Sequence, residues 1–405
     1  MTDPVPLPAG VRDVLPVEAA ELRALGDALA GAFASFGFRE VMTPLIELAD
    51  VLDRAEEDGV GRAYRLFDDE GRVLVLRPDL TIPIARLVAT RMADQPDPVR
   101  VSYNARAVRP PAPGKIEGAE QRQAGIELVG LDGPEADAEV IAALATGLAA
   151  AGVPDARIAV GSVALVSAVI AGAGADAQAQ QAMWAALRGR SLVDWRAAAA
   201  GSGAGGEAAA TLADLPSLRG GAEVLDRVAA AVPDAAAECS RLGEVLRLVA
   251  LHGVTPPMVD LGVVRDWAYY SGVVIEAYAA GAMAPVAVGG RYDGLAARFG
   301  RPRTAVGVAV ALDLLHHAVG RGAERPDAGI VLVGGSDEFI ADAAALRARG
   351  TAVVALPADA ADAEAVALAD GRRFVVRRDG AGWTARDVIG GADITVPDLG
   401  EGPWT

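Results

Sequence analysis

The sequence predicts an α+β fold in which helices flank an antiparallel sheet, with a helical insertion and a small α/β domain at the C-terminal end. Three observations support this prediction. Strand-like segments on either side of residues 155–258 follow one another as hairpins, which favours antiparallel pairing over a βαβ array. Residues 155–258 carry a mostly Ala-rich helical pattern. Residues 327–390 alternate strands and helices, which is typical of a small α/β domain.

These changes of pattern set the expected domain boundaries. The main domain covers residues 1–320 and includes the insertion at about 155–258. Residues 321–405 form a linker and the small domain. The linker lies in "GRGAERPDAG", residues 320–329, because this stretch combines glycine, proline and charge.

The first element is a helix over residues 17–36. Apolar side chains recur in it at helical spacing and predict one buried stripe, formed by Leu22, Leu25, Leu29, Phe33 and Phe36. Gly37 is expected to end the helix as a left-handed glycine. Residues 38–46 then predict a strand, and Pro44 places that strand at an edge or an interface.

The later elements of the main domain follow from apolar runs and their breakers. Residues 73–76 predict a strand, and a helix is expected after Pro83. Two strands, residues 98–109 and 122–130, are joined by a loop rich in proline. A helix is expected from Pro134 to about Ala151. Strands return after the insertion in residues 257–279, 284–290 and 304–310.

The small domain is predicted to have a βαβαβ order. Its expected elements are a strand at 329–335, a helix at 336–349, a strand at 351–358, a helix at 362–370 and a strand at 372–378.

The composition limits the classes of function. The 405 residues carry a formal net charge of −17, and Lys115 is the only lysine among the basic residues. An acidic chain without a basic run binds nucleic acid poorly, because phosphate neutralisation supplies most of that affinity. Cys239 is the single cysteine, which excludes an internal disulfide and a cysteine-based zinc site and fits a reducing cytoplasm. We expect no signal peptide and no membrane span.

The three histidines do not predict a metal site. His316 and His317 are neighbours on a predicted helix, where successive side chains point about 100° apart. His252 lies near a predicted helix end, where a partial positive charge is favourable. We expect neither a metal ion nor a cofactor.

Five stretches, in this order, resemble the class II aminoacyl-tRNA synthetases, and among them histidyl-tRNA synthetase and its paralogues. They are "GFREVMTPLIE", "LRPDLTIPIAR", "RVSYNARAVR" with "RQAGIELVG", "LGVVRDWAYYSG", and "GGRYDGL" with "AVGVAVALDLL". The resemblance covers most of residues 6–320 and, more weakly, the small domain within residues 321–405, which resembles a shortened anticodon-binding domain. It implies a class II synthetase-like fold, and it implies that the first stretch forms a dimer interface.

The residues that the synthetases use for ATP are largely replaced. Phosphate chemistry favours arginines, whose guanidinium groups hold phosphate oxygens bidentately. Arg109 fills one such place by resemblance. Glu117 and Ala119 stand where loop arginines are expected, and Ala311 and Leu314 replace a glycine and an arginine of the third motif. Aminoacylation is therefore expected to be lost.

The residues that would hold the amino acid are better retained. By resemblance, the candidate histidine-binding residues are Asp79, Thr81, Arg109, Gln123, Glu127, Arg265, Tyr269 and Tyr270. Asp79 and Thr81 would accept hydrogen bonds from the amine. Gln123 and Glu127 lie four apart on one strand and so share a face. The resemblance places Arg265 near the carboxylate and the two tyrosines near the imidazole.

Each candidate also has an ordinary structural interpretation. Asp79 could cap the following helix, Gln123 and Glu127 could form a solvated strand face, and the tyrosines could be core and surface residues. The segment between the candidates also departs from the synthetase pattern, because Asp266, Trp267 and Ala268 replace Gly, Leu and Asp. Ala268 lacks the carboxylate that the synthetases have at this position, so selectivity for imidazole is expected to be weaker than theirs.

The resemblance favours a regulatory, non-catalytic subunit of ATP phosphoribosyltransferase in histidine biosynthesis. It implies three partners: the short-form catalytic subunit, a second copy of the chain, and L-histidine as feedback inhibitor. No nucleic acid is expected, because the helices of the small domain are acidic or neutral. An active histidyl-tRNA synthetase and a tRNA-binding pseudo-synthetase remain the alternatives.

Overall fold

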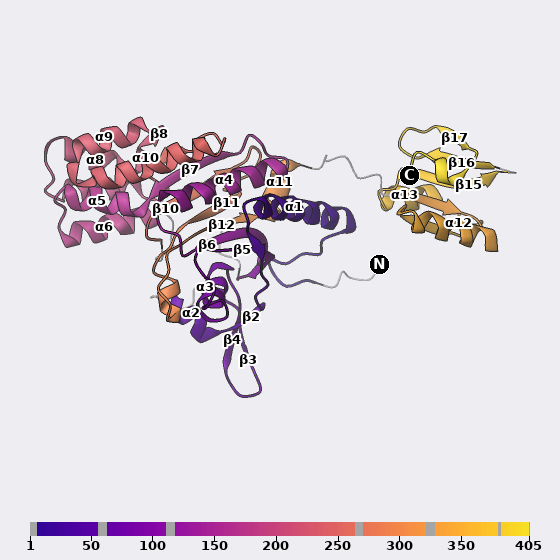
Figure 1. The fold of residues 1–405 in the computed structure, drawn as a ribbon, viewed down its shortest axis with the longest axis horizontal. Coiled ribbons are helices and arrows are strands. Elements are labelled where there is room, and N and C mark those ends of the chain that lie inside the picture. The colour runs from indigo at the N-terminus through magenta and orange to yellow at the C-terminus, as the bar shows by residue number, and fades with distance from the viewer. Residues whose placement is uncertain are drawn as a thin grey trace. The chain divides into compact units, whose positions relative to one another are not determined.

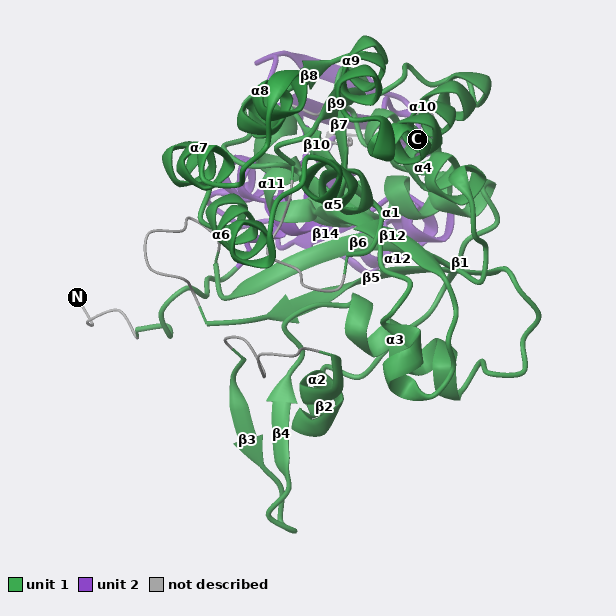
Figure 2. Cartoon of the chain, turned by 90° about the vertical axis from the view of Figure 1, so that its left-hand side faces the viewer, with its two compact units in different colours: residues 1–13, 22–319 green, residues 14–21, 320–405 purple. Residues whose placement is uncertain are grey.

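The computed structural model divides into two compact units. The described residues are 6–55, 63–110, 118–263, 270–320, 329–379 and 382–404. One unit comprises residues 1–13 and 22–319, and the other comprises residues 14–21 and 320–405 (Figure 2). Within the described ranges, no helix has both the length and the apolar character needed to cross a membrane.

A mixed sheet of nine strands forms the centre of the first unit, as far as the described residues go. Its order is β1-β5-β6-β12-β11-β10-β7-β9-β8. The strands are β1 (Arg39–Glu40), β5 (Val99–Val108), β6 (Glu120–Val129), β12 (Ala305–Ala311), β11 (Ala287–Arg291), β10 (Val273–Tyr278), β7 (Arg157–Ser162), β9 (Met258–Asp260) and β8 (Arg219–Gly220). Only the pairs β1–β5 and β7–β9 are parallel among the described strands of this sheet. The predicted fold class is confirmed.

Helices α1 (Pro16–Ser35), α4 (Pro134–Ala150) and α11 (Leu312–Val319) flank this sheet (Figure 1). The predicted stripe of α1 is buried at Leu22, Leu25, Leu29 and Phe33, whereas Phe36 is half-buried beside His252. Gly37 ends the helix with φ +83°, as expected. Helix α4 approaches α1 closely, because a Cβ at Gly147 would lie 3.0 Å from Leu29.

A separate three-stranded sheet corrects two expectations. Its order is β2 (Ile46–Leu48), β4 (Val73–Leu76), β3 (Arg65–Phe67), and it lies next to α2 (Ala49–Ala55) and α3 (Thr81–Thr90). The strand predicted over 38–46 is divided between β1 and β2, because the buried guanidinium of Arg77 binds the intervening carbonyls of Thr43 and Pro44. Helix α3 begins before Pro83, since proline is tolerated in a first turn, where its missing N–H is not needed.

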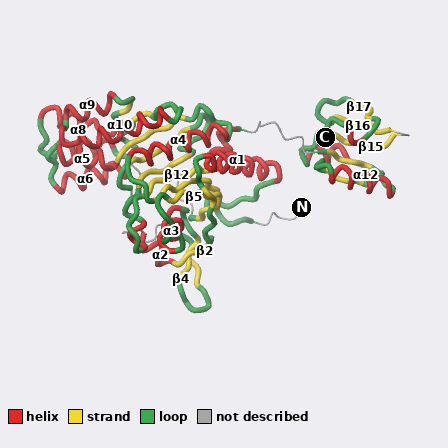
Figure 3. Tube along the Cα trace, in the orientation of Figure 1, coloured by secondary structure: helices red, strands yellow, loops and turns green. Residues whose placement is uncertain are grey.

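The predicted helical insertion is mostly helical from Val163 to Leu251, but its two ends and the short strand β8 within it belong to the nine-stranded sheet. Strand β7 pairs with β10, which lies more than a hundred residues later in the chain. The helices are α5 (Val163–Gly172), α6 (Ala177–Arg188), α7 (Leu192–Ala200), α8 (Gly206–Asp214), α9 (Glu223–Ala231) and α10 (Ala236–Leu251), and they gather at one end of the sheet (Figure 3). The short apolar run of β7 does not by itself distinguish a strand from a buried helix.

The second unit contains the predicted βαβαβ order and two further strands. Its five described strands have the order β14 (Val353–Leu356), β13 (Ile330–Val333), β15 (Phe374–Asp379), β16 (Gly382–Asp387), β17 (Asp393–Val396). Helices α12 (Asp337–Ala348) and α13 (Ala363–Ala369) complete it. The first three strands are parallel, and β16 and β17 add an antiparallel edge that the sequence analysis missed. Trp404 packs on Phe374 in its core.

Candidate functional site

Glycines on one face of the nine-stranded sheet leave room for larger side chains. The register aligns, from β5 to β7, residues Val101, Glu127, Gly307, Gly290, Val274 and Gly161. A Cβ at Gly307 would lie 1.6 Å from Glu127 Oε2, and a Cβ at Gly290 would lie 3.0 Å from the Tyr270 ring. The Glu127 side chain therefore extends over β12, and the Tyr270 ring lies over β11.

Glu127 is the centre of a buried polar group, which we call the Glu127 cluster. Its members are Asp79, Thr81, Tyr103, Glu127, Tyr270 and Tyr292. The Glu127 side chain is 1% exposed. The hydroxyl of Thr81 donates to its Oε1 at 3.0 Å, and the hydroxyl of Tyr292 donates to its Oε2. The structure thus brings two predicted residues, Thr81 and Glu127, into direct contact and excludes a solvated position for Glu127.

Burial raises the pKa of Glu127 to about 7, because the charged form loses its hydration. The two hydroxyl hydrogen bonds lower this pKa, and the nearby charge of Asp79 raises it. Two carboxyl groups in a dry site repel each other unless a cation or a proton lies between them. The arrangement is suited to an ammonium or imidazolium group, which would supply both charge and hydrogen-bond donors.

Asp79 caps helix α3, as its ordinary structural interpretation proposed. Its Oδ1 accepts a hydrogen bond from the backbone N–H of Ile82 at 2.9 Å. The side chain is nonetheless buried, and it acts electrostatically on both Glu127 and Tyr103. The capping role therefore explains the local turn without removing Asp79 from the cluster.

Tyr103 and Tyr292 belong to the cluster although the sequence analysis did not select them. Both are 3% exposed. Tyr103 lies opposite Gly125 in the register of β5 with β6, and Tyr292 directly follows β11. Tyr292 stood in a Gly-rich stretch that alone suggests only a turn, and the position of Tyr103 depends on the strand register. Only a correct pairing of β5, β6, β12 and β11 would have identified them.

Two further candidates, Gln123 and Arg109, lie farther from Glu127 than the members of the cluster do. Gln123 is partly exposed, and it shares the face of Glu127 on β6, opposite Ala105 and Ala311. The guanidinium of Arg109 donates to Gln121 Oε1 at 2.6 Å. Gln121 is six residues from Glu127, which is about 20 Å along a strand, so this contact does not bring Arg109 to Glu127.

Two candidates and part of the loop between β5 and β6 lie outside the described residues. Arg265 and Tyr269 lie outside the described residues, as do residues 266–268 and Glu117. The tyrosine that is described, Tyr270, contributes to the electrostatic environment of Tyr103.

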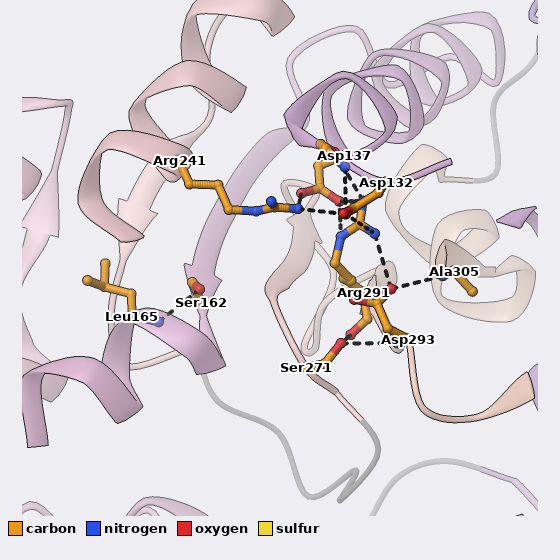
Figure 4. Close-up of polar contacts among 10 residues, drawn as sticks. Asp132, Asp137, Ser162, Leu165, Arg241, Ser271, Arg291, Asp293 and Ala305 are labelled. Atoms are coloured by element: carbon orange, nitrogen blue, oxygen red, sulfur yellow. Dashed lines mark hydrogen bonds and ion pairs between the residues drawn. The ribbon is translucent and has the colours of Figure 1, made fainter. Parts of the chain in front are cut away.

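On the opposite face of the sheet, a buried arginine fixes the turn that carries Tyr292 (Figure 4). Arg291 is 2% exposed and donates to Asp137 Oδ1 at 2.9 Å, to Asp293 Oδ1 at 3.1 Å and to the carbonyl of Gly133 at 3.1 Å. Asp293 Oδ1 also accepts from the N–H of Ala305. These bonds tie β11 to α4 and β12, so the chain between Arg291 and Asp293 has one defined path.

The chain is similar to known proteins over most of its length. Residues 10–315 match the family described as histidyl-tRNA synthetase. An ATP phosphoribosyltransferase regulatory subunit from Moorella thermoacetica is 40% identical, over 87% of this chain and 92% of that protein. A protein of the same name from Rubrobacter xylanophilus is 36% identical, over 97% of this chain and 93% of that protein.

Solved structures agree with these sequence matches. An ATP phosphoribosyltransferase regulatory subunit/histidyl-tRNA synthetase from Bacillus halodurans C superimposes with a TM-score of 0.83 at 28% identity, covering 94% of this chain and all of that one. A histidyl-tRNA synthetase from Nostoc sp. PCC 7120 shares the fold with a TM-score of 0.81 at 21% identity, covering 96% of both chains. The chain therefore belongs to the histidyl-tRNA synthetase-like family and, within it, to the ATP phosphoribosyltransferase regulatory subunits.

Proposed function

We propose that this chain activates the short catalytic subunit of ATP phosphoribosyltransferase in the cytoplasm and conveys feedback inhibition by L-histidine, which it binds at the Glu127 cluster. The observation that carries the proposal is the buried carboxyl of Glu127, held by two hydroxyl donors beside the carboxyl of Asp79. An amino acid brings a cation to this site, and the cation offsets the repulsion between the two carboxyl groups. Family membership supports histidine as that amino acid.

Loss of aminoacylation is part of the proposal. The face of the sheet that carries Glu127 continues from Gln123 to four alanines, Ala105, Ala107, Ala309 and Ala311. A methyl group cannot bind a phosphate oxygen, whereas catalysis on ATP requires fixed positive groups at the developing charge. Helix α11 begins directly after β12 and carries Leu314 where the synthetase pattern has arginine. The chain would therefore hold an amino acid without activating it.

The apolar surface around β2 and β3 supports self-association. Exposed apolar side chains gather there at Met42, Leu45, Ile46, Leu48, Leu66 and Phe67. An exposed patch of this kind is typical of a protein interface. We propose that it forms the twofold contact of a dimer, around which catalytic subunits assemble.

Two polar links connect this apolar surface to the Glu127 cluster. Glu47 on β2 accepts from Arg86 of α3 at 2.8 Å, and α3 also carries Thr81. The guanidinium of Arg77, two residues before Asp79, donates to the carbonyl of Thr43 at 2.6 Å. A ligand that shifts α3 would thus act on the interface, and by linkage the assembled complex would act on ligand affinity.

The proposal is tested by phosphoribosyl-ATP formation. The catalytic subunit from the same organism is titrated with this chain, with and without histidine. We expect the rate to rise and histidine to reverse the rise. No rise, together with failure of the two chains to co-elute, contradicts the proposal, and histidine-dependent ATP–pyrophosphate exchange by the pure chain would then favour an active synthetase.

A matched pair of glycine variants tests the location of the site. In Gly307→Ala the added Cβ overlaps the carboxyl of Glu127, whereas at Gly294 a Cβ meets no atom within 4 Å. We expect Gly307→Ala to abolish inhibition by histidine and Gly294→Ala to retain it. Equal inhibition of both variants would move the histidine site away from Glu127.

A further inference from the structure

Tyr103 carries a buried hydroxyl that has no hydrogen-bond partner among the described residues. Its side chain is 3% exposed. The hydroxyl lies over β6, since a Cβ at Gly125 would be 2.3 Å from Tyr103 Oη. A buried hydroxyl without a partner costs free energy, because it gives up its bonds to water and gains none.

The surroundings of this hydroxyl are the titratable groups of the Glu127 cluster. Burial is the largest cause that raises the pKa of Tyr103 well above its usual range, followed by the charges of Glu127 and Asp79 and by Tyr270. These groups come from β6, from the turn before α3 and from the segment before β10. The phenol therefore stays protonated, and it can both donate a hydrogen bond and accept one.

We propose that the Tyr103 hydroxyl is a direct, specificity-determining contact to the ligand bound at the Glu127 cluster. This inference rests on the proposed function of that cluster as an amino-acid site. The ligand class is a compact amine whose cationic group faces the two carboxyls and whose adjacent polar atom bonds the hydroxyl. Such a ligand satisfies the hydroxyl, whereas a ligand with an apolar group at that position leaves it buried and unbonded.

The inference has two consequences that separate a ligand contact from a structural role. Removal of an unmatched hydroxyl does not weaken the unliganded protein, since no bond is lost there. The same removal weakens ligand binding, on the order of 10-fold for one hydrogen bond. If the hydroxyl instead held the fold together, its removal would lower the stability of the unliganded protein, and any change in ligand affinity would only follow from that loss.

The test uses Tyr103→Phe in the full chain, with Tyr64→Phe as control. Tyr64 precedes β3 in the separate three-stranded sheet and lies outside the cluster. The melting temperature is measured without ligand, and the Kd for L-histidine is measured by calorimetry. We expect Tyr103→Phe to melt at the wild-type temperature or above it and to bind histidine about 10-fold more weakly. Tyr64→Phe should change neither quantity.

Three other outcomes overturn the inference. An unchanged Kd in Tyr103→Phe removes the ligand contact while leaving the proposed function of the cluster intact. A lower melting temperature, or a failure to fold, means that the hydroxyl has a structural partner. Absence of histidine binding by the wild-type chain refutes the amino-acid site itself, and the assignment of Tyr103 with it.

Discussion

The buried carboxyl of Glu127 makes the stability of this protein depend on pH in a specific direction. Burial raises its pKa from the ordinary 4.5 to about 7. Between these two values the folded chain keeps a proton that the unfolded chain has lost, so stability falls as the pH rises through this window. One pKa unit corresponds to about 1.36 kcal/mol. Relative to a carboxyl with the ordinary pKa, Glu127 therefore lowers the free energy of unfolding by about 3 kcal/mol at pH ~8 and by about 1 kcal/mol at pH ~5.5.

Replacement of Glu127 by Gln removes this cost and nearly preserves the shape of the side chain. The hydroxyls of Thr81 and Tyr292 remain satisfied, because each can donate to the amide oxygen or accept from the amide nitrogen. We therefore expect Glu127→Gln to be more stable than the wild type by about 3 kcal/mol at pH ~8 and by about 1 kcal/mol at pH ~5.5. Histidine binding should weaken about 10- to 100-fold, because a charge-assisted hydrogen bond is lost.

The assay is urea denaturation of both proteins at the two pH values. Glu120→Gln, on the same strand but exposed, is the control and should change stability by less than about 0.5 kcal/mol at either pH. An advantage of Glu127→Gln that is equal at the two pH values would refute the reasoning, because the effect would then not come from ionisation. A variant less stable than the wild type at pH ~8 would show that the charged carboxyl is stabilised in the fold.

The other predictions concern the remaining buried groups. Asp137→Asn leaves the guanidinium of Arg291 without its closest buried carboxylate and should destabilise the chain by about 3–5 kcal/mol. Glu244→Gln, which breaks an exposed pair with Arg247, should leave the free energy of unfolding nearly unchanged in the same urea titration, because solvent screens that pair. A loss of stability equal to that of Asp137→Asn would contradict the role of burial. Burial raises the pKa of Cys239 to about 11. At pH ~8 only about one thiol in a thousand is ionised, so a thiol reagent should label the chain only after unfolding, and rapid labelling of the folded protein would disprove this.

The sequence by itself determined the local elements and the family. The apolar stripe of α1 and the left-handed glycine at its end follow from spacing and from backbone freedom, which are properties of neighbouring residues. Strands β5, β6, β11 and β12 were likewise predicted from short apolar runs. The five motifs indicated the synthetase-like fold and the regulatory subunits of ATP phosphoribosyltransferase, and the comparisons confirmed both.

Only the tertiary structure decided which side chains meet. Tyr103 and Glu127 lie on the paired strands β5 and β6, whereas Tyr292 follows β11, more than 150 residues later in the chain. They meet because the register places Gly125 and Gly307 beneath the side chains of Tyr103 and Glu127. Strand β7 was missed for a related reason, since its partner β10 lies more than a hundred residues away. Strand register and burial depend on contacts between distant segments, and local periodicity does not encode those contacts. The roles of Arg265 and Tyr269 stay predictions from the resemblance.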